Sequence, residues 1–537
     1  MEGEVTNRDV AERLALMDRL LEVAGEDRHR AAAYARAARQ IERLPLTVAG
    51  LDEEALTRIP GIGVRIAGQI REIVERGSFQ ELDELQATVP GSVVELLDIP
   101  GVGPRTLHVL WKELGILTID DLEAAVRGRR LRGTRGFGAK REEAIGKAIR
   151  RYREREDVMS RSEADALLKR VAAHLPGVEW VVAGGYRRGA ATIDEVEVVA
   201  IGSGEDISLH GDRVKVRFTG TERFGTALLC ATGSAGFLAR LGEEAGAQGY
   251  RLEPGGLVDL RSGRIQTFES EEDIFEFLGM EAIPPELRED RGEVELAFRH
   301  ALPELVEISD LRGDFHSHTT ASDGHQSLED VAAVGDAMGY EYIAITDHSS
   351  RVSVEALARQ RAGIERVNRR HTCQLLAGSE VDIRSDGSLG YPDRVLADLD
   401  LVIASVHSGL DQDEDILTRR VLGAMENEHV DIIGHPTGRL IGRRPPYAID
   451  LDRVIEHAAV TGTALEINAS PHRLDLEDIY IWRAKKRGVK LAAGTDAHRV
   501  AEFSNIRYGI MMARRGWCTP DDLVNTLTLS ELLEWLS

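Results

Sequence analysis

Seven short apolar runs, separated by stretches of helical character, follow Leu311 in this sequence. They read GDFHSH, YIAITDH, LLAGSEVDI, LVIASVH, VDIIGHP, ALEINAS and LAAGTDAH. Short apolar strands that alternate with helices predict a parallel sheet in an α/β domain. Six of the runs have histidine, aspartate or glutamate among their last two residues. Because the carboxyl ends of the strands in a parallel barrel meet at one rim, where active sites lie, we expect a polar site there.

The polar residues at these strand ends form a set of nine candidate metal ligands. They are His316, His318, Asp323, His348, Glu380, His407, His435, Asp496 and His498. A single one of these histidines would be interpreted as a hydrogen-bonded core or rim residue. Together, nine imidazole and carboxylate donors suit two or three ions, and they suit zinc, manganese or iron better than calcium or magnesium alone.

Length and composition limit what surrounds this site. With about 150 residues per domain as a guide, 537 residues predict three or four domains. The sequence has no run of 18 apolar residues, and its acidic start, MEGEVTNRDV, does not resemble a signal peptide. We therefore expect a cytoplasmic protein without a membrane span, and a monomer. Cys230, Cys373 and Cys518 lie far apart, so neither a disulfide framework nor a cysteine zinc site is expected.

Residues 1–153 read as short helices interrupted by glycine-rich turns. Two turns are near copies, LTRIPGIGVRIAGQI (56–70) and LLDIPGVGPRTLHVL (96–110), and TRGFGAKREEAI (134–145) is a looser third. The pattern is typical of helix-hairpin-helix motifs, whose backbone N–H groups can meet a phosphate. One such turn alone could be a helix connector, but the repetition favours sequence-independent DNA binding. The predicted contacts are Gly61, Gly63, Arg65, Gly101, Gly103, Arg105 and Lys140.

The charge distribution agrees with a DNA-binding front half. The net charge of −24 argues against nucleic acid at first sight. Between Arg127 and Arg153, however, eleven lysines and arginines face only two glutamates. Such a run is more often a solvated helix face, so it supports the hairpin argument without carrying it.

The segment RRGAATIDEVEVVAIG (187–202) raises the possibility of a second site. Glu195 and Glu197 are one residue apart on an expected strand, so their carboxylates point to the same face, as in a polymerase that holds two magnesium ions. Further along, EAIPPELREDRG (281–292) reads as a proline-bearing, charged linker.

Several motifs resemble known families. DFHSHTTASDG, AITDHS, AGSEVDI, ASVHSG, IGHPTGRLIGRR and GTDAH resemble the polymerase-and-histidinol-phosphatase (PHP) superfamily. The order of hairpin repeats, GGYRRG, IPPELRE and this barrel resembles the bacterial and archaeal family-X DNA polymerases over essentially the whole chain. The resemblance implies a multidomain α/β protein with helical helix-hairpin-helix domains, a nucleotidyltransferase-like palm and thumb, and a distorted (βα)7 PHP barrel.

The resemblance also implies domain boundaries. They are a helical domain over 1–85, a fingers-like domain over 86–157, a palm-like domain over 158–233, a thumb-like domain over 234–290, a linker over 291–310 and the PHP domain over 311–537. In the barrel it implies a trinuclear metal centre at the nine positions, Mn²⁺-dependent hydrolysis at DNA 3′ ends, and 3′-phosphate removal as a companion activity. Arg439, Arg443 and Arg444 are candidates for a phosphate clamp, with a solvated loop as the equal alternative.

The palm-like region departs from the family pattern. Gly185 stands where the family has a phosphate-contacting serine, although Arg187 and Arg188 are retained. The two family aspartates fall on Glu195 and Glu197, and the third carboxylate position falls on Lys215; Asp212, three residues earlier, would face the other side. A glutamate moves its carboxylate outward by about 1.5 Å, which magnesium geometry does not tolerate, and a lysine repels the ions. We expect an inactive polymerase site, unless the glutamates suffice with manganese.

Lyase chemistry in the front domain is not expected. The family's lyase lysine would form a Schiff base, but no lysine precedes Lys112 and the matching position is Gln69. DNA binding by Arg65 and Tyr34 is unaffected by this argument.

Three hypotheses follow. The first is a DNA 3′-end-processing exonuclease or phosphatase that works through the barrel. The second is a gap-filling DNA polymerase that uses Glu195 and Glu197. The third is a non-catalytic scaffold that binds DNA ends. A small-molecule phosphatase is a weaker fourth, because it would have no use for the hairpins.

Overall fold

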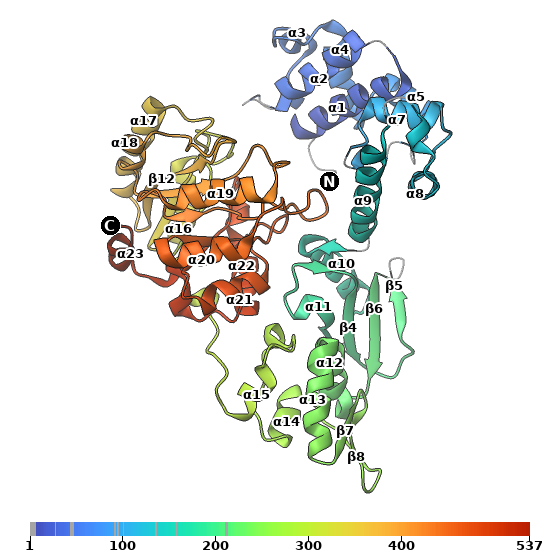
Figure 1. Cartoon of the computed structure of the whole chain (residues 1–537), viewed down its shortest axis with the longest axis vertical. Coiled ribbons are helices and arrows are strands. Elements are labelled where there is room, and N and C mark those ends of the chain that lie inside the picture. Colours follow the sequence, from blue (N-terminus) through green and yellow to red (C-terminus); the bar gives the residue numbers. More distant parts are fainter. Residues whose placement is uncertain are drawn as a thin grey trace. The chain divides into compact units, whose positions relative to one another are not determined.

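The computed structural model describes residues 7–26, 28–42, 44, 48–90, 93, 96–99, 101–134, 137–156, 158–209 and 213–537. Asp212, considered above as a substitute carboxylate, lies outside these ranges. The chain forms two compact units, Met1–Asp157 and Val158–Ser537 (Figure 1). No described helix is both long enough and apolar enough to span a membrane.

The first unit is helical around a single apolar core that includes Leu14, Ile70 and Leu107. Its helices are α1 (Asn7–Ala24), α2 (Arg28–Glu42), α3 (Glu53–Thr57), α4 (Val64–Arg76), α5 (Gln80–Thr88), α7 (Pro104–Lys112), α8 (Ile119–Arg127) and α9 (Ala139–Glu156). Short 3-10 turns η1 (Val48–Gly50), η2 (Leu96–Asp98) and η3 (Leu131–Gly133) connect some of them.

The two near-copied turns have the same backbone geometry. Gly61 and Gly101 both have φ of +89°, a conformation that favours glycine. The next residue of each turn, Ile62 or Val102, is buried in the core. Gly63 and Gly103 then cap α4 and α7 with no side-chain hydrogen bond among the described residues. Each turn therefore anchors itself with one apolar side chain and presents a helix N-terminus.

The second unit begins with a palm-like sheet. It contains β1 (Met159–Ser160), α10 (Arg161–His174), β2 (Trp180–Val182), α11 (Gly184–Arg187), β3 (Thr192–Ile193), β4 (Val196–Ile201), β5 (Ile207–Leu209), β6 (Val214–Thr219), η4 (Thr221–Arg223) and α12 (Phe224–Thr232). The main sheet has the order β2-β4-β6-β5, and only β4 and β6 are parallel neighbours. Val196 and Val198 pack in one cluster with α10, whereas Val199 packs with α12. Glu197 is therefore on the α12 side of β4, because side chains alternate along a strand.

A thumb-like region follows, with α13 (Ala235–Ala247), β7 (Tyr250–Glu253), β8 (Gly256–Asp259), β9 (Ile265–Gln266), α14 (Glu271–Phe277), η5 (Pro285–Leu287) and α15 (Glu293–Phe298). The linker expected over 281–292 is wrong: Ile283 and Leu287 are buried in this region's core, and Arg288 forms a buried ion pair with Glu271. Prolines and charged residues separate the apolar side chains of this segment, so the sequence shows no periodicity there. Val294 belongs to the same core, within the range 291–310 that was also expected to be a linker.

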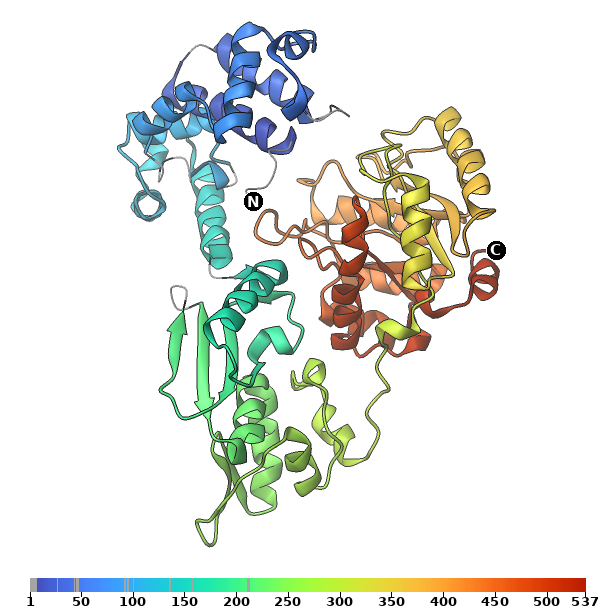
Figure 2. The same ribbon diagram turned by 180° about the vertical axis from the view of Figure 1, so that it is seen from behind.

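The remaining chain, coloured from yellow to red in Figure 2, forms a seven-stranded parallel sheet in sequence order. Its strands are β10 (Gly313–Asp314), β11 (Tyr342–Ile345), β12 (Gln374–Asp382), β13 (Leu401–Ser405), β14 (Ile432–Ile433), β15 (Ala464–Asn468) and β16 (Leu491–Gly494). A parallel bridge between Ser317 and Ala497 joins the ends of the first and last strands, so the sheet is a nearly closed barrel. The expected fold class, including the distorted (βα)7 barrel, is confirmed.

Alternating side chains divide the barrel into two layers. Outward residues such as Ile343 and Val402 pack with the surrounding helices, and inward residues such as Leu376 and Ile403 fill the interior. The helices are α16 (Leu328–Met338), α17 (Val354–Asn368), α18 (Asp393–Leu396), α19 (Glu414–Met425), α20 (Leu451–Thr461), α21 (Asp478–Lys486), α22 (Ile506–Arg515) and α23 (Leu529–Trp535), with 3-10 turns η6 (Ile308–Asp310), η7 (Val500–Asn505), η8 (Pro520–Asp522) and η9 (Val524–Thr526). Glu380 is in phase with Leu376 on β12, so it faces the interior near the rim.

Candidate metal centre

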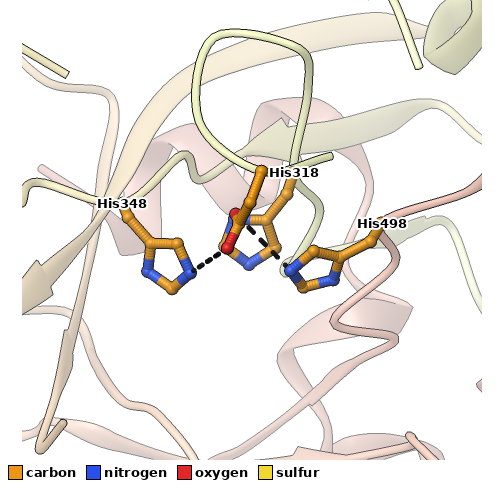
Figure 3. A group of neighbouring side chains, drawn as sticks. His318, His348 and His498 are labelled. Carbon is orange, nitrogen blue, oxygen red and sulfur yellow. Dashed lines mark ion pairs between the residues drawn. The ribbon is translucent and has the colours of Figure 1, made fainter. Parts of the chain in front are cut away.

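The rim of the barrel gathers three overlapping groups of potential ligands. The first contains His318, Asp323, His348 and His498, whose ligand atoms lie within 4.8 Å of one another. Figure 3 shows the three histidines converging from different segments on one carboxylate. That carboxylate is Asp323, with Oδ2 at 3.4 Å from Nε2 of His348 and Oδ1 at 3.6 Å from Nε2 of His498.

The other two groups share residues with the first. His316, His318 and Asp496 form one, with Asp496 Oδ1 at 3.2 Å from Nε2 of His318 and 3.7 Å from Nε2 of His316. His348, Glu380 and His407 form the other. His318 and His348 each belong to two groups, so the three ligand groups lie side by side along the rim.

Glu380 connects these groups. Its Oε2 lies 2.8 Å from Nδ1 of His348, and its Oε1 lies 3.1 Å from Nε2 of His407 and 2.9 Å from Nε2 of His435. The structure thus brings together all nine residues that the strand-end pattern predicted, with His435 attached through Glu380.

Several buried polar atoms of the centre have no hydrogen-bond partner within the described part of the chain. They are Nε2 of His316, both ring nitrogens of His318, Oδ1 of Asp323 and Nδ1 of His435. Buried polar atoms are normally satisfied, because leaving one unpaired costs about 1–3 kcal/mol. Imidazole and carboxylate atoms that converge without partners fit divalent transition-metal ions.

Carboxylates and imidazoles of the centre shift one another's pKa. Burial acts to lower the pKa of His316, His348, His407 and His498, but the neighbouring carboxylates raise it in all four. Burial acts to raise the pKa of Glu380, but the neighbouring His407 and His316 hold that pKa well below its usual range. Burial also acts to raise the pKa of Asp496, but nearby positive charge, that of His316 first, holds this pKa well below its usual range. Burial lowers the pKa of His318 and His435, which favours neutral imidazoles with a free lone pair.

Two carboxylates that the sequence reasoning missed orient the histidines. His316 donates from Nδ1 to Glu466 over 2.6 Å, and His407 donates from Nδ1 to Asp382 over 2.7 Å. Such contacts fix the tautomer and leave Nε2 for a metal. Asp382 is two residues after Glu380 and Glu466 lies in the sixth run, so both could have been found by following alternation inside the strands.

The backbone is unusual at two ligand positions. His435 and Asp496 have φ of 26° and 54°, values that non-glycine residues rarely adopt and that cluster at functional sites. Gly494, two residues before Asp496, has no room for a side chain, because a Cβ there would lie 2.6 Å from Cβ of His316. Close approach of the first and last strands therefore depends on this glycine.

The predicted phosphate clamp is arranged differently. Arg439 donates from Nε to the carbonyl of Arg473 over 2.7 Å, from Nη2 to the carbonyl of Leu474 and from Nη1 to Glu477. Arg444 donates to the carbonyl of Gly438, and the backbone N–H of Arg443 donates to Leu440. The guanidinium of Arg439 is thus committed to a neighbouring loop rather than to a clamp.

The palm-like carboxylates have a different partner. Glu197 on β4 is paired in register with Lys215 on β6, and the Lys215 ammonium forms an ion pair with Glu195. Burial, followed by the neighbouring Glu195, raises the pKa of Glu197. The groups of potential metal ligands found among the described residues do not include this cluster.

The retained arginines of GGYRRG are engaged in ion pairs. Arg187 forms a bidentate pair with Glu271 at 2.8 and 2.7 Å, and Arg188 pairs with Glu289 at 2.8 Å. A Cβ at Gly185 would lie 3.6 Å from Cβ of Ala190 and 4.0 Å from Nη2 of Arg188.

In the first unit, Gly61, Gly63, Arg65, Gly101, Gly103, Arg105 and Lys140 are all exposed, as a DNA surface requires. Tyr34 is an exception to the sequence interpretation: it is buried and its hydroxyl lies 3.0 Å from Gln69 and 3.1 Å from Glu81. Arg65 forms an ion pair with the same Glu81. Tyr34 is a core residue because the apolar spacing of α2 turns its ring toward Phe79.

Four family models match the chain. A helix-hairpin-helix domain matches residues 5–79, and a SAM-like helix-hairpin-helix tandem matches 93–151. A DNA polymerase beta thumb matches 227–289, and a PHP domain matches 314–470. These matches cover the hairpin unit, the thumb-like region and most of the barrel.

A relative from Bacillus subtilis (strain 168), described as DNA polymerase/3′-5′ exonuclease PolX, is 33% identical over 567 residues. The match covers 98% of this chain and 99% of the relative. The chain belongs to the PolX family. Within PolX, it has the expected order of hairpin motifs, thumb and PHP barrel.

Shorter relatives match this PolX chain in part. A probable phosphatase from Caldanaerobacter subterraneus is 33% identical over 245 residues, which cover 42% of this chain and 90% of the relative. A probable phosphatase from Thermoanaerobacter sp. (strain X514) is 29% identical over 235 residues, covering 40% of this chain and 89% of the relative.

Proposed function

We propose that this PolX protein is a metal-dependent 3′-5′ exonuclease, or 3′-end-processing phosphoesterase, that acts through its barrel. The observation that carries this proposal is the set of three ligand groups sharing His318 and His348, with buried donor atoms that lack partners in the described chain. The Bacillus subtilis relative is described as a polymerase and 3′-5′ exonuclease, and the barrel-length relatives as probable phosphatases, which supports phosphoester chemistry.

We assign the nine rim residues as ligands of two or three divalent ions, with Mn²⁺ the best fit and Zn²⁺ or iron as alternatives. When bound, such ions lower the pKa of an attacking water and neutralise charge on the phosphate. Glu466 and Asp382 hold the Nδ1 protons of His316 and His407, so that Nε2 of each ring faces the centre. His316 and His318 are fully buried and close the floor of the site to bulk water.

The proposed reaction is hydrolysis of the last phosphodiester of a DNA strand. The water oxygen bonds to phosphorus, and the bond from phosphorus to the 3′ oxygen of the preceding nucleotide breaks. That oxygen takes a proton, which leaves a new 3′-hydroxyl end and a nucleoside 5′-monophosphate. On a 3′-phosphate end, the same attack releases inorganic phosphate.

The hairpin turns are the proposed DNA-binding surface. Their exposed glycines leave helix N-termini open to phosphate oxygens, with Arg65, Arg105 and Lys140 beside them. The contacts are to the backbone, so we propose binding of gapped or 3′-ended DNA without sequence preference, by a monomer.

We further propose that the palm-like site does not transfer nucleotides. In support, the Lys215 ammonium lies in register with Glu197 and pairs with Glu195, which neutralises the cluster without a metal. Arg187 and Arg188 are engaged by Glu271 and Glu289 rather than open to a triphosphate.

The decisive experiment uses gapped DNA with a labelled primer and Mn²⁺, with and without dNTPs. We expect shortening of the primer by the wild type and none by Asp496→Ala or His316→Ala. Absence of shortening by the metal-loaded wild type would exclude the proposed function, and gap binding without turnover would identify a scaffold instead.

A gap-filling polymerase is the second candidate, favoured by the description of the Bacillus subtilis relative. In the same assay it predicts primer extension that Glu195→Ala abolishes. Extension that persists in Glu195→Ala would place the activity elsewhere, and no extension would discard this candidate.

A further inference from the structure

One cation beside the metal centre has no role in the assignment above. Arg473 lies in the loop between β15 and α21, and its Nε is 3.2 Å from Oδ2 of Asp496. The two oxygens of Asp496 have different surroundings. Oδ1 faces the ring nitrogens of His316 and His318. Oδ2 pairs with the guanidinium of Arg473 and accepts a hydrogen bond from the side-chain amide of Asn468 over 3.2 Å. Arg473 therefore stands directly behind one proposed ligand, at the edge of the site.

The guanidinium of Arg473 is only partly satisfied. Its Nη1 is buried and has no hydrogen-bond partner among the residues that the structure describes. The side chain as a whole is 16% exposed, so part of it can be reached from outside. A buried charged donor without a partner is costly, and an oxygen that arrives with the substrate would remove that cost.

The loop that carries Arg473 is held in place by the arginine that the sequence suggested as a clamp. Arg439 donates to the carbonyls of Arg473 and Leu474, and its third contact is Glu477 at the start of α21. On the other side, the N–H of Thr437 donates to Asp475 over 3.0 Å. Arg439 thus fixes the backbone on which Arg473 stands, next to the His435 loop.

The shape of the guanidinium suits an oxyanion beside Arg473. A planar guanidinium offers parallel N–H donors that match two phosphate oxygens, which a lysine cannot do. One edge of Arg473 faces the ligand carboxylate, so another edge remains for a second oxygen that accepts a hydrogen bond.

We propose that Arg473 binds a non-bridging oxygen of the phosphate undergoing attack, and that Arg439 is a positioning residue that holds the Arg473 loop. This assignment rests on the proposed phosphoesterase function of the barrel. The shared chemistry is a phosphate group, whether it comes from an internal phosphodiester or from a terminal 3′-phosphate. Arg473 would be a catalytic residue, because it touches the reacting group, and Arg439 would act through it.

The test compares the full-length wild type with Arg473→Ala and Arg473→Lys. The matched control is Arg419→Ala, which removes an exposed arginine that pairs with Asp415 on α19. Three quantities are measured: bound Mn²⁺ by elemental analysis, affinity of the Mn²⁺-loaded protein for inorganic phosphate by calorimetry, and kcat and KM on 3′-hydroxyl and 3′-phosphate DNA ends.

We expect Arg473→Ala to retain its Mn²⁺, to bind inorganic phosphate about tenfold more weakly and to lose about a hundredfold in kcat/KM on both kinds of end. Arg473→Lys should fall between these values, and added guanidinium salt should restore part of the activity of Arg473→Ala but not that of an Asp496 variant. Loss on only one kind of end would identify the source of the phosphate that Arg473 contacts.

Two results would overturn the assignment. In one, Arg473→Ala has wild-type phosphate affinity and kcat/KM while the wild type cleaves DNA. In the other, Mn²⁺ is lost together with activity and guanidinium restores nothing, which would make Arg473 a structural partner of Asp496. A wild type that binds phosphate through Arg473 but cleaves no DNA would instead exclude the proposed function and keep the phosphate contact.

Discussion

The palm-like sheet and the barrel rim both gather carboxylates, but they surround them with different bases. In the palm, Glu195 and Glu197 meet the ammonium of Lys215. At the rim, Glu380 meets five imidazoles, those of His316, His318, His348, His407 and His435. An ammonium neutralises carboxylates but has no lone pair to give, whereas a neutral imidazole can share a metal with them. The kind of base beside the carboxylates, more than their number, distinguishes an ion-paired cluster from a metal site.

The largest effect is expected from Glu380→Gln. Glu380 contacts five of the proposed ligand histidines, so its loss should reduce DNA cleavage by at least about a thousandfold and lower the bound Mn²⁺. Glu197→Gln in the palm is the matched control and should leave cleavage unchanged. Equal losses in the two variants would show that the two regions do not differ as described.

A second variant attempts to convert the palm into a metal site. Glu195→Asp, Glu197→Asp and Lys215→Asp are combined in the Glu380→Gln background, so that barrel metals do not interfere. We expect this variant to bind magnesium, because a third carboxylate replaces the ammonium and the two glutamate side chains are shortened to aspartate. Calorimetry measures the binding. If the parent already binds magnesium with the same affinity, then Lys215 does not neutralise the site.

An intermediate effect is expected from Glu466→Gln. Glu466 holds the Nδ1 proton of His316, and removing such a contact lowers metal affinity by about 10- to 100-fold. Titration of the apoprotein with Mn²⁺ measures the change. Glu414→Gln, at an exposed position in the first turn of α19, is the control and should match the wild type.

The smallest effect is expected from Glu197→Gln on stability. Burial raises the pKa of Glu197 in the folded state, so the carboxyl favours folding below its unfolded pKa of 4.5 and loses that contribution as pH rises through the folded pKa. Glu197→Gln should therefore be more stable than the wild type at pH 7, by less than about 1 kcal/mol, since the site is partly solvated. Denaturation with urea at pH 7 and pH 4 should show the difference at pH 7 alone.

The barrel could be predicted from the sequence because seven of the nine ligands lie within four residues after an apolar strand, and parallel strands bring their ends together. The partners of those ligands were harder to find. Glu466 lies inside a strand, and Arg473 lies in an irregular loop without periodicity. Arg439 was expected to contact the phosphate. Nothing in the sequence shows that its guanidinium instead donates hydrogen bonds to the carbonyls of Arg473 and Leu474. Tyr34 was misplaced because an aromatic residue among arginines resembles a surface contact, whereas its ring packs near Phe79.

The bridge between Ser317 and Ala497 has a consequence for how the protein is made. Two of the three ligand groups combine residues of the first strand end with Asp496 or His498, near the other end of the barrel. A chain still under synthesis that has not yet produced β16 holds neither group complete. Contacts between distant segments form late, because the closure of a long loop must precede them. The proposed metal centre therefore forms only after β16 has been synthesised, and a chain that stops before residue 496 lacks complete versions of two of the three ligand groups.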